Sequence, residues 1–188
     1  MALGADRETC TKPIELEAAN LDASQKSNTM VFRDVVISQC DIRVSAQTAR
    51  SSGGLNFENT RWTFEGDVNI HVEQRGNLRS DQAVVDFQDN RIAKATITGS
   101  PAEFEQQRSD TQALARGRAG EIVYEVGPGT VRLTSDAWLS DGRTEISGPL
   151  LVYNIREERV QGATNPGENQ RVRITIAPKE PPAKPKKP

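Results

Sequence analysis

The sequence predicts an all-β protein in which antiparallel strands are stacked rung upon rung, with two sheets facing each other in a jelly-roll or sandwich-like arrangement. Three observations support this. Apolar and polar residues alternate along almost the whole chain, short turn-forming clusters separate the alternating runs, and a strand unit recurs at roughly 30 to 37 residues. No sustained helical periodicity competes with them, so helix is at most a minor element.

The alternating runs identify the strands. Clear examples are Ile14–Ala18, Ile42–Ala46 and Val68–Val72. A period of two places successive side chains on opposite faces of a sheet, so these are half-buried strands. Clusters of Asp, Asn, Gly and Ser break the runs and favour turns by their access to positive or preset φ; they include Ala23–Asn28, Gln88–Arg91 and Gly127–Gly129.

Two pieces recur within the chain. The first is a strand, a small or acidic bend and another strand; it is found at Phe32–Ile37, Phe64–Ile70 and Leu133–Leu139. The second is an aromatic residue followed by a turn and a β-branched residue, and it runs from Phe87 to Ile92, Tyr124 to Val131 and Tyr153 to Val160. One such unit cannot bury its apolar face alone, but stacked units form a continuous core. Parallel β-helix is the rival arrangement, and the short hairpin-like turns favour antiparallel pairing.

Composition places the chain among ordinary globular domains. Apolar residues make up 35% of the 188 residues, charged residues 27%, and the formal net charge is -2. The near-neutral balance argues against a nucleic-acid partner, and no uncharged stretch approaches the roughly 20 apolar residues of a membrane span. We expect residues 1–12 to be a lead-in, residues 13–177 a single domain, and residues 178–188 a disordered tail rich in Pro and Lys.

The chain start and the cysteines bear on the compartment. Residues 1–6 lack the basic and apolar regions of a signal peptide, which fits either a cytosolic protein or a mature chain with an added methionine. Cys10 and Cys40 are compatible with one disulfide in an oxidising compartment, or with two reduced thiols. Aligning residues 14–16 with residues 42–44 places Cys10 two residues from Cys40, near enough for adjustment into a bridge between adjacent rungs.

The sequence lacks the side chains of the common catalytic sites. His71 is the single histidine, so a histidine-based nucleophile triad or a multi-histidine metal site cannot be assembled, and no metal or cofactor is expected. Most acids alternate with apolar residues or occupy turns, as Glu15, Glu17, Asp34 and Asp67 do, which favours a solvated face over paired catalytic carboxylates. Trp62 and Trp138 are expected to pack in the core rather than to form a sugar-stacking platform.

The order of these segments resembles the LptA/OstA-like family of periplasmic lipopolysaccharide-transport proteins. In the first half the resemblance rests on residues 13–18, 30–39 and 41–46. In the second half it rests on residues 99–104, 119–124, 131–139, 148–153 and 171–178. The resemblance covers nearly the whole chain from Pro13 to Pro178.

The resemblance implies an open, twisted antiparallel jelly roll whose sheets enclose an apolar groove for the acyl chains of lipopolysaccharide. Matched position by position, the groove residues are Ile14, Leu16, Val35, Ile37, Phe104, Tyr124, Val126, Leu133 and Leu139, and each of them is equally compatible with ordinary core.

The family also implies an open edge at each end, to which another jelly roll adds strand to strand. The edges are residues 14–18 and 171–176, with Ile14, Ala18, Arg171 and Ile176 at their limits. The implied partners are lipopolysaccharide, further copies joined head to tail, an inner-membrane-anchored LptC-like jelly roll, and an LptD-like outer-membrane translocon.

Between Ala46 and Phe87 the chain carries about one more unit than the shortest pattern of the family.

From the resemblance and the lack of a catalytic site, the predicted function is a non-enzymatic periplasmic carrier that bridges the inner and outer membranes. A β-solenoid that binds or cleaves polysaccharide is the alternative, and it predicts a surface row of aromatics with paired acids. An adhesin-like structural module is the third possibility and predicts a tightly filled interior.

Overall fold

The computed structural model describes residues 12–40, 42–53, 59–73, 76–89, 91–107, 114–154, 157, 159–163 and 171–178. Within these ranges every regular element is a β-strand. The strands are β1 Glu15–Glu17, β2 Asn20–Ser24, β3 Thr29–Gln39, β4 Ile42–Ser52, β5 Arg61–Val72, β6 Gly76–Gln88, β7 Arg91–Gln107, β8 Leu114–Glu125, β9 Thr130–Ser140, β10 Thr144–Asn154, β11 Arg159–Ala163 and β12 Arg173–Ile176. The all-β prediction is confirmed. The first predicted strand is shorter than expected, because Ile14 and Ala18 lie outside β1.

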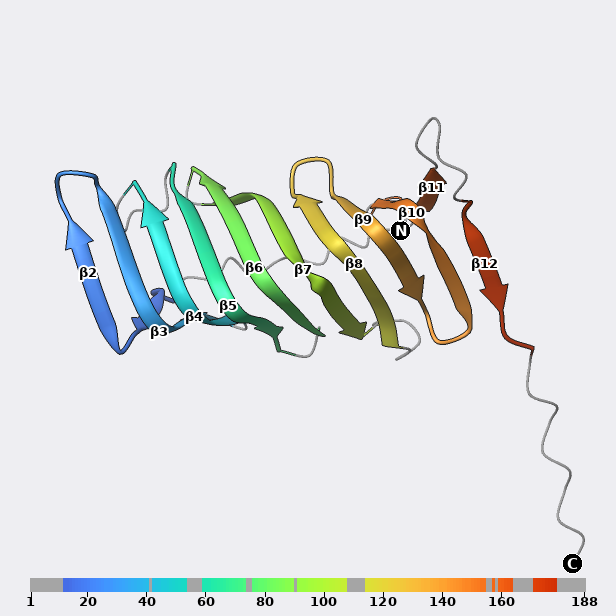
Figure 1. Ribbon diagram of the computed structural model, residues 1–188, viewed down its shortest axis with the longest axis horizontal. Coiled ribbons are helices and arrows are strands. Elements are labelled where there is room, and N and C mark those ends of the chain that lie inside the picture. The colour runs from blue at the N-terminus through green and yellow to red at the C-terminus, as the bar shows by residue number, and fades with distance from the viewer. Residues whose placement is uncertain are drawn as a thin grey trace, which may run out of the picture.

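The strands form one elongated antiparallel sheet, with β3 to β10 side by side in chain order (Figure 1). Each short end strand covers only half of its neighbour: β1 and β2 pair with different halves of β3, and β12 and β11 pair with different halves of β10. Every strand pair of the described residues is antiparallel, which excludes the parallel β-helix for this part of the chain.

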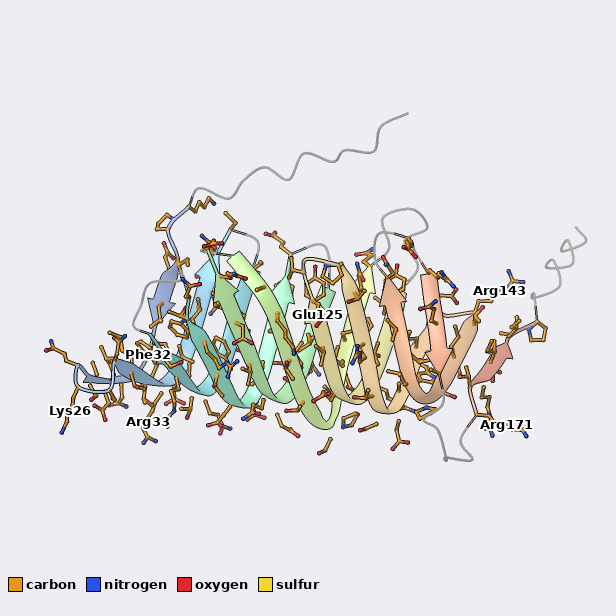
Figure 2. All side chains as sticks on the ribbon, turned by 90° about the horizontal axis from the view of Figure 1, so that it is seen from above. Lys26, Phe32, Arg33, Glu125, Arg143 and Arg171 are labelled. Atoms are coloured by element: carbon orange, nitrogen blue, oxygen red, sulfur yellow. The ribbon has the colours of Figure 1, made fainter. Side chains whose placement is uncertain are left out.

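A line of β-bulges crosses the sheet and divides it into two halves. Register shifts fall near the middle of the pairings from β4–β5 to β9–β10. At this line Asp34, Gly66, Asp67, Ser135 and Asp136 have positive φ. A bulge bends its strand and increases its twist, so each long strand folds over and the two halves face each other. From above, the strands look like a series of hoops (Figure 2).

The acidic or small bend of the first recurring piece lies on this line, at a bulge in β5 and β9 and at a positive φ without a register shift in β3. Asp34 follows Phe32, Asp67 follows Phe64, and Asp136 follows Leu133, each at a positive φ between 47° and 60°. Asp is among the few residues other than Gly that visit this region readily, because its short side chain bonds locally. The second recurring piece marks the hairpins, since Phe87 and Ile92, Tyr124 and Val131, and Tyr153 and Val160 are direct cross-strand partners.

The core lies next to the bulges, on the inner face. We call it the core row, a ladder of direct cross-strand partners that runs from β3 to β10: Phe32, Ala49, Phe64, Ala83, Ile97, Ile122, Leu133 and Leu151. All of them are buried. Trp62, on the adjacent inner row, is fully buried between Phe32 and Phe64, with ring centroids 5.8 and 6.1 Å away and nearly parallel planes.

Candidate functional site

A second inner ladder, which we call the open row, runs through the other half of the sheet from the first strand to the last. Its members are direct cross-strand partners in succession: Leu16, Ile37, Val44, Ile70, Leu78, Phe104, Gly117, Leu139, Ile146 and Ile174. Every position is apolar or glycine. From Leu16 to Ile146 the side chains are only partly buried, packed on the core from one side. The molecule therefore keeps a continuous apolar strip that is not fully covered.

Register and alternation together place these side chains. Within one strand the residues on either side of an open-row position point outward, as Glu103 and Glu105 do around Phe104; both are exposed. A slip of one residue in any pairing would exchange the two faces. The strip is thus a property of the whole ladder rather than of a few residues.

Phe104 and Gly117 are the closest fit within the open row. They are direct partners on β7 and β8. A Cβ atom added at Gly117 would lie 2.2 Å from Cε1 of the Phe104 ring and 2.9 Å from Cδ2 of Leu139. The absence of a side chain at Gly117 therefore lets the Phe104 ring lie close against β8.

The outer face carries charged side chains that pair across strands. Arg61 Nε donates to Asp86 Oδ1 at 2.6 Å, and Arg116 Nε lies 3.0 Å from Glu105 Oε1. The hydrogen bond to Asp86, helped by its charge, raises the pKa of Arg61. His71 Nδ1 lies 2.5 Å from Asn77 Oδ1 on the same face. Asp86 is half-buried and the other groups are exposed, so these side chains are in contact with solvent and form no enclosed site.

The two ends of the molecule expose apolar residues that belong to the inner face. Ile174 and Ile176 on β12 are 59% and 65% exposed, and Leu21 on β2 is 59% exposed. Leu21 pairs with Phe32 and so extends the core row, while Ile174 ends the open row. The inner ladders therefore reach solvent at both ends, where no further strand of the described residues pairs with β1, β2, β11 or β12.

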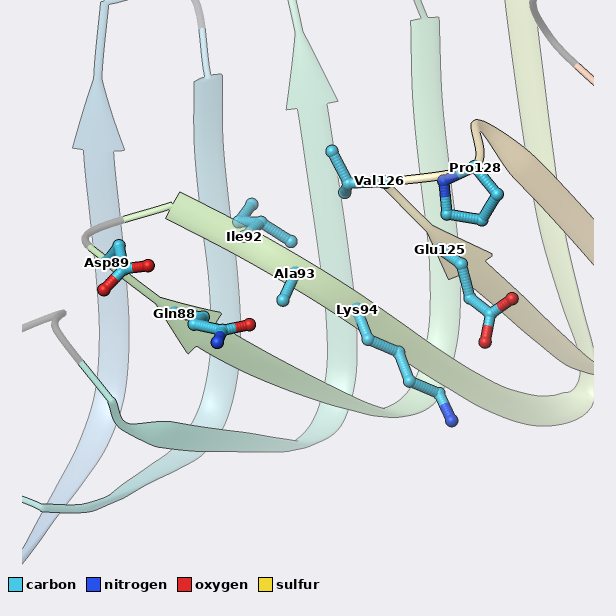
Figure 3. A pocket seen from close by; sticks show the side chains of 9 residues that line it. Gln88, Asp89, Ile92, Ala93, Lys94, Glu125, Val126 and Pro128 are labelled. Carbon is cyan, nitrogen blue, oxygen red and sulfur yellow. The ribbon is translucent and has the colours of Figure 1, made fainter.

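Two hollows indent the surface away from the open row. One of about 770 Å³ lies at the rim between the β6–β7 and β8–β9 turns, with Ile92, Val126 and Pro128 beside Lys94 and Glu125 (Figure 3). The other, of about 570 Å³, lies by β2 and includes Leu21, Arg33 and Arg50. Both have mixed polar and apolar walls, so neither is a purely apolar lipid slot.

The described residues contain no group of three or more His, Cys, Asp or Glu side chains that could hold a metal ion. A search of the same residues finds no helix long and apolar enough to cross a membrane.

Comparison with known proteins decides the family. Residues 51–159 match the family model of the LptA/(LptD N-terminal domain) LPS transport protein. The chain belongs to this family. LptA-like proteins are transport proteins, and the match spans the strands from the end of β4 to the start of β11.

Individual relatives agree with the family assignment. The chain is 27% identical over 128 residues to the lipopolysaccharide export system protein LptA of Escherichia coli K12, and equally similar to that of Shigella flexneri, covering 67% of either chain. The fold matches the crystal structure of LptH, the LptA homologous periplasmic component of the lipopolysaccharide transport device from Pseudomonas aeruginosa. That match has a TM-score of 0.56 at 19% identity and covers 89% of this chain and 96% of that chain. The open, twisted jelly roll of LptA-like proteins is thus the fold of this chain.

The structure brings part of the predicted groove together. Leu16, Ile37, Phe104 and Leu139 all belong to the open row. The other predicted groove residues lie elsewhere: Val35 and Leu133 are fully buried in the core, Tyr124 is half-buried on the row of Trp62, Val126 is in the rim turn, and Ile14 precedes β1. Their contact with lipid stays a prediction.

Sequence reasoning missed six members of the open row: the apolar Val44, Ile70, Leu78, Ile146 and Ile174, and Gly117. The five apolar residues could be recognised in the sequence as inward-facing, because each lies in an alternating run. Assigning them to the same row as Phe104 requires the cross-strand register, which bulges shift and which the runs alone do not determine.

The prediction for one tryptophan is wrong. Trp62 is core, as expected, but Trp138 lies on the outer face, next to Ala137 and Leu139 that point inward. The Arg118 guanidinium carbon lies 5.1 Å from its ring centroid, a cation–π contact at the surface. Alternation with the inward Ala137 and Leu139 places Trp138 on the outer face, and the position of Trp138 in the recurring piece does not show this.

Cys40 follows β3 in a turn, with a positive φ of 53°. Residues 1–11, which include Cys10, and residues 179–188 lie outside the described residues. The disulfide, the limits of the lead-in and the disorder of the tail therefore stay predictions. Of the edge residues, Arg171 precedes β12 and Ile176 ends it.

Proposed function

We propose that this chain carries lipopolysaccharide through the periplasm, with the acyl chains lying along the open row. The observation that supports this most is the continuity of the row, a partly uncovered apolar ladder from β1 to β10 that ends in the exposed Ile174. Burying one methylene gains about 0.8 kcal/mol, so an apolar strip retains acyl chains without any dedicated polar site. The sugars and phosphates stay in water beside the charged outer face.

The chain acts as one segment of a head-to-tail bridge, with an LptC-like jelly roll at the inner membrane and an LptD-like translocon at the outer membrane as its terminal partners. Support comes from the uncovered strand edges at both ends and from the relatives, which are named as components of lipopolysaccharide export. The name of the matched structure, a periplasmic component, supports the compartment. Lipid moves along such a bridge by affinity and mass action, and no chemical step is involved.

A photo-crosslinking residue at Phe104 tests the carrier function. With labelled lipopolysaccharide we expect a crosslinked adduct from this position, because its side chain belongs to the open row. The matched control places the same residue at Glu103, the exposed neighbour that points outward on the same strand. An adduct at Glu103 equal to that at Phe104, or no adduct at Phe104, would contradict the proposal.

A further inference from the structure

The two ends of the sheet carry opposite charge, and this feature extends the proposed function. The described strands at the N-terminal end carry Glu15 and Glu17 on β1 and Asp22 on β2, with no basic residue in either strand. The strands at the C-terminal end carry Arg159 on β11 and Arg173 on β12, with no acidic residue in either strand. All of these side chains are exposed.

The strand directions at the two ends allow a second copy of the chain, in the same orientation as the first, to pair with it strand to strand. Each step from β1 through β3 to β10 and on to β12 is antiparallel, and the number of steps is odd, so β1 and β12 run in opposite directions. The β1 strand of a second copy, placed beyond β12 in the same orientation, therefore pairs antiparallel with it. The same holds for β2 beyond β11.

We propose that a second copy of this chain docks on β12 in one register, with its Leu16 opposite Ile174 and its Glu17 opposite Arg173. This joint rests on the proposed bridge and specifies it. The register is the one that continues the open row from Ile174 into Leu16 of the next copy, and it also sets Ile176 opposite Ile14. The exposed area of Ile174 and Ile176 is covered in this way.

Antiparallel pairing then determines the neighbours on the outer face. With Ile174 opposite Leu16, the preceding Arg173 faces Glu17 and the following Thr175 faces Glu15 of the next copy. Opposite charges directly across an antiparallel pair attract, and like charges repel. A joint between two N-terminal ends would set acids against acids, so the charges select head-to-tail assembly and give the assembly a polarity.

Charge reversal tests the joint, with self-association measured by sedimentation velocity over a range of concentrations. We expect Glu17→Arg and Arg173→Glu each to weaken association of the full chain about five- to tenfold, because a favourable pair becomes a repulsive one. A one-to-one mixture of the two variants should restore association, since both kinds of mixed joint pair Arg with Glu. The double variant should associate with itself and reject the wild-type chain.

The register has its own control. Glu15→Arg alone should associate like the wild-type chain, because Glu15 faces Thr175 and not Arg173. A loss of association with Glu15→Arg as large as that with Glu17→Arg, or no recovery when Glu17→Arg is mixed with Arg173→Glu, would overturn the register while leaving the bridge intact. Wild-type chains that never associate would contradict both the joint and the bridge, whereas the carrier function is tested separately by the Phe104 adduct. Folding of each variant is checked by its circular dichroism spectrum.

Discussion

At the scale of single residues, the aromatic stack of Phe32, Trp62 and Phe64 contributes three large buried side chains to the inner face. Trp62 is fully buried, and both stacked neighbours are buried as well. Large side chains here fill the space between the two facing halves of the sheet. The cross-strand partners of Phe64 on both sides, Ala49 and Ala83, are small, which leaves room for the rings.

Truncation of Trp62 should therefore be costly. We expect Trp62→Ala to lower the free energy of unfolding by about 3–5 kcal/mol, since it removes a buried aromatic side chain and leaves a cavity. The matched control is Trp138→Ala, which loses an outer-face contact with Arg118 worth about 1 kcal/mol. Denaturant titration followed by circular dichroism measures both. Equal losses from the two variants would contradict the assignment of Trp62 to the core and Trp138 to the surface.

Asp67 has a backbone role at the bulge of β5. Its φ is 47°, and its carboxylate accepts a hydrogen bond of 2.6 Å from the Gln47 amide. We expect Asp67→Val to lower the free energy of unfolding by about 1–3 kcal/mol, because a β-branched residue is strained at this φ. Asp67→Asn should have a small effect. Asp81→Val, at an exposed strand position without positive φ, is the control, and a loss as large as that of Asp67→Val would argue against backbone strain.

At the scale of elements, the fit of β7 on β8 depends on Gly117. We expect Gly117→Ala to push the Phe104 ring toward the open side of the row, because the added methyl would overlap the ring. The affinity for lipopolysaccharide should then fall several-fold. Binding is measured by titration with labelled lipopolysaccharide. Gly127→Ala, where no atom lies within 4 Å of the added methyl, is the control. Unchanged affinity in Gly117→Ala would show that the ring does not border the lipid.

The elements also show what sequence can and cannot predict here. Alternation, turn clusters and the recurring pieces were enough to predict antiparallel strands, and the bends at Asp34, Asp67 and Asp136 lie where the repeat indicated. The open row was only partly predicted, because Val35 and Ile37 have the same local pattern but lie in the core and in the open row respectively. Both follow the bend at Asp34 on the same inner face, and Val35 is the one next to the bend, where the side chain is buried. Alternation alone does not show this distance from the bend.

At the scale of the whole molecule, bending every strand at one line produces two different inner rows from one alternating pattern. The core row lies in one half and is buried, which holds the molecule together. The open row lies in the other half and remains partly uncovered from end to end. The proposed lipid path thus consists of other residues than the buried core, against which the open-row side chains pack from one side.

The most direct test of this account places the photo-crosslinking residue, one variant at a time, at Leu16, Leu78 and Leu139. These positions sample the open row at its first strand, in its middle and near its last strand. The account predicts lipopolysaccharide adducts at all three, and none at their outward neighbours Glu17, Arg79 and Ser140. Adducts confined to one of the three positions, with the others silent, would contradict a continuous lipid path along the molecule.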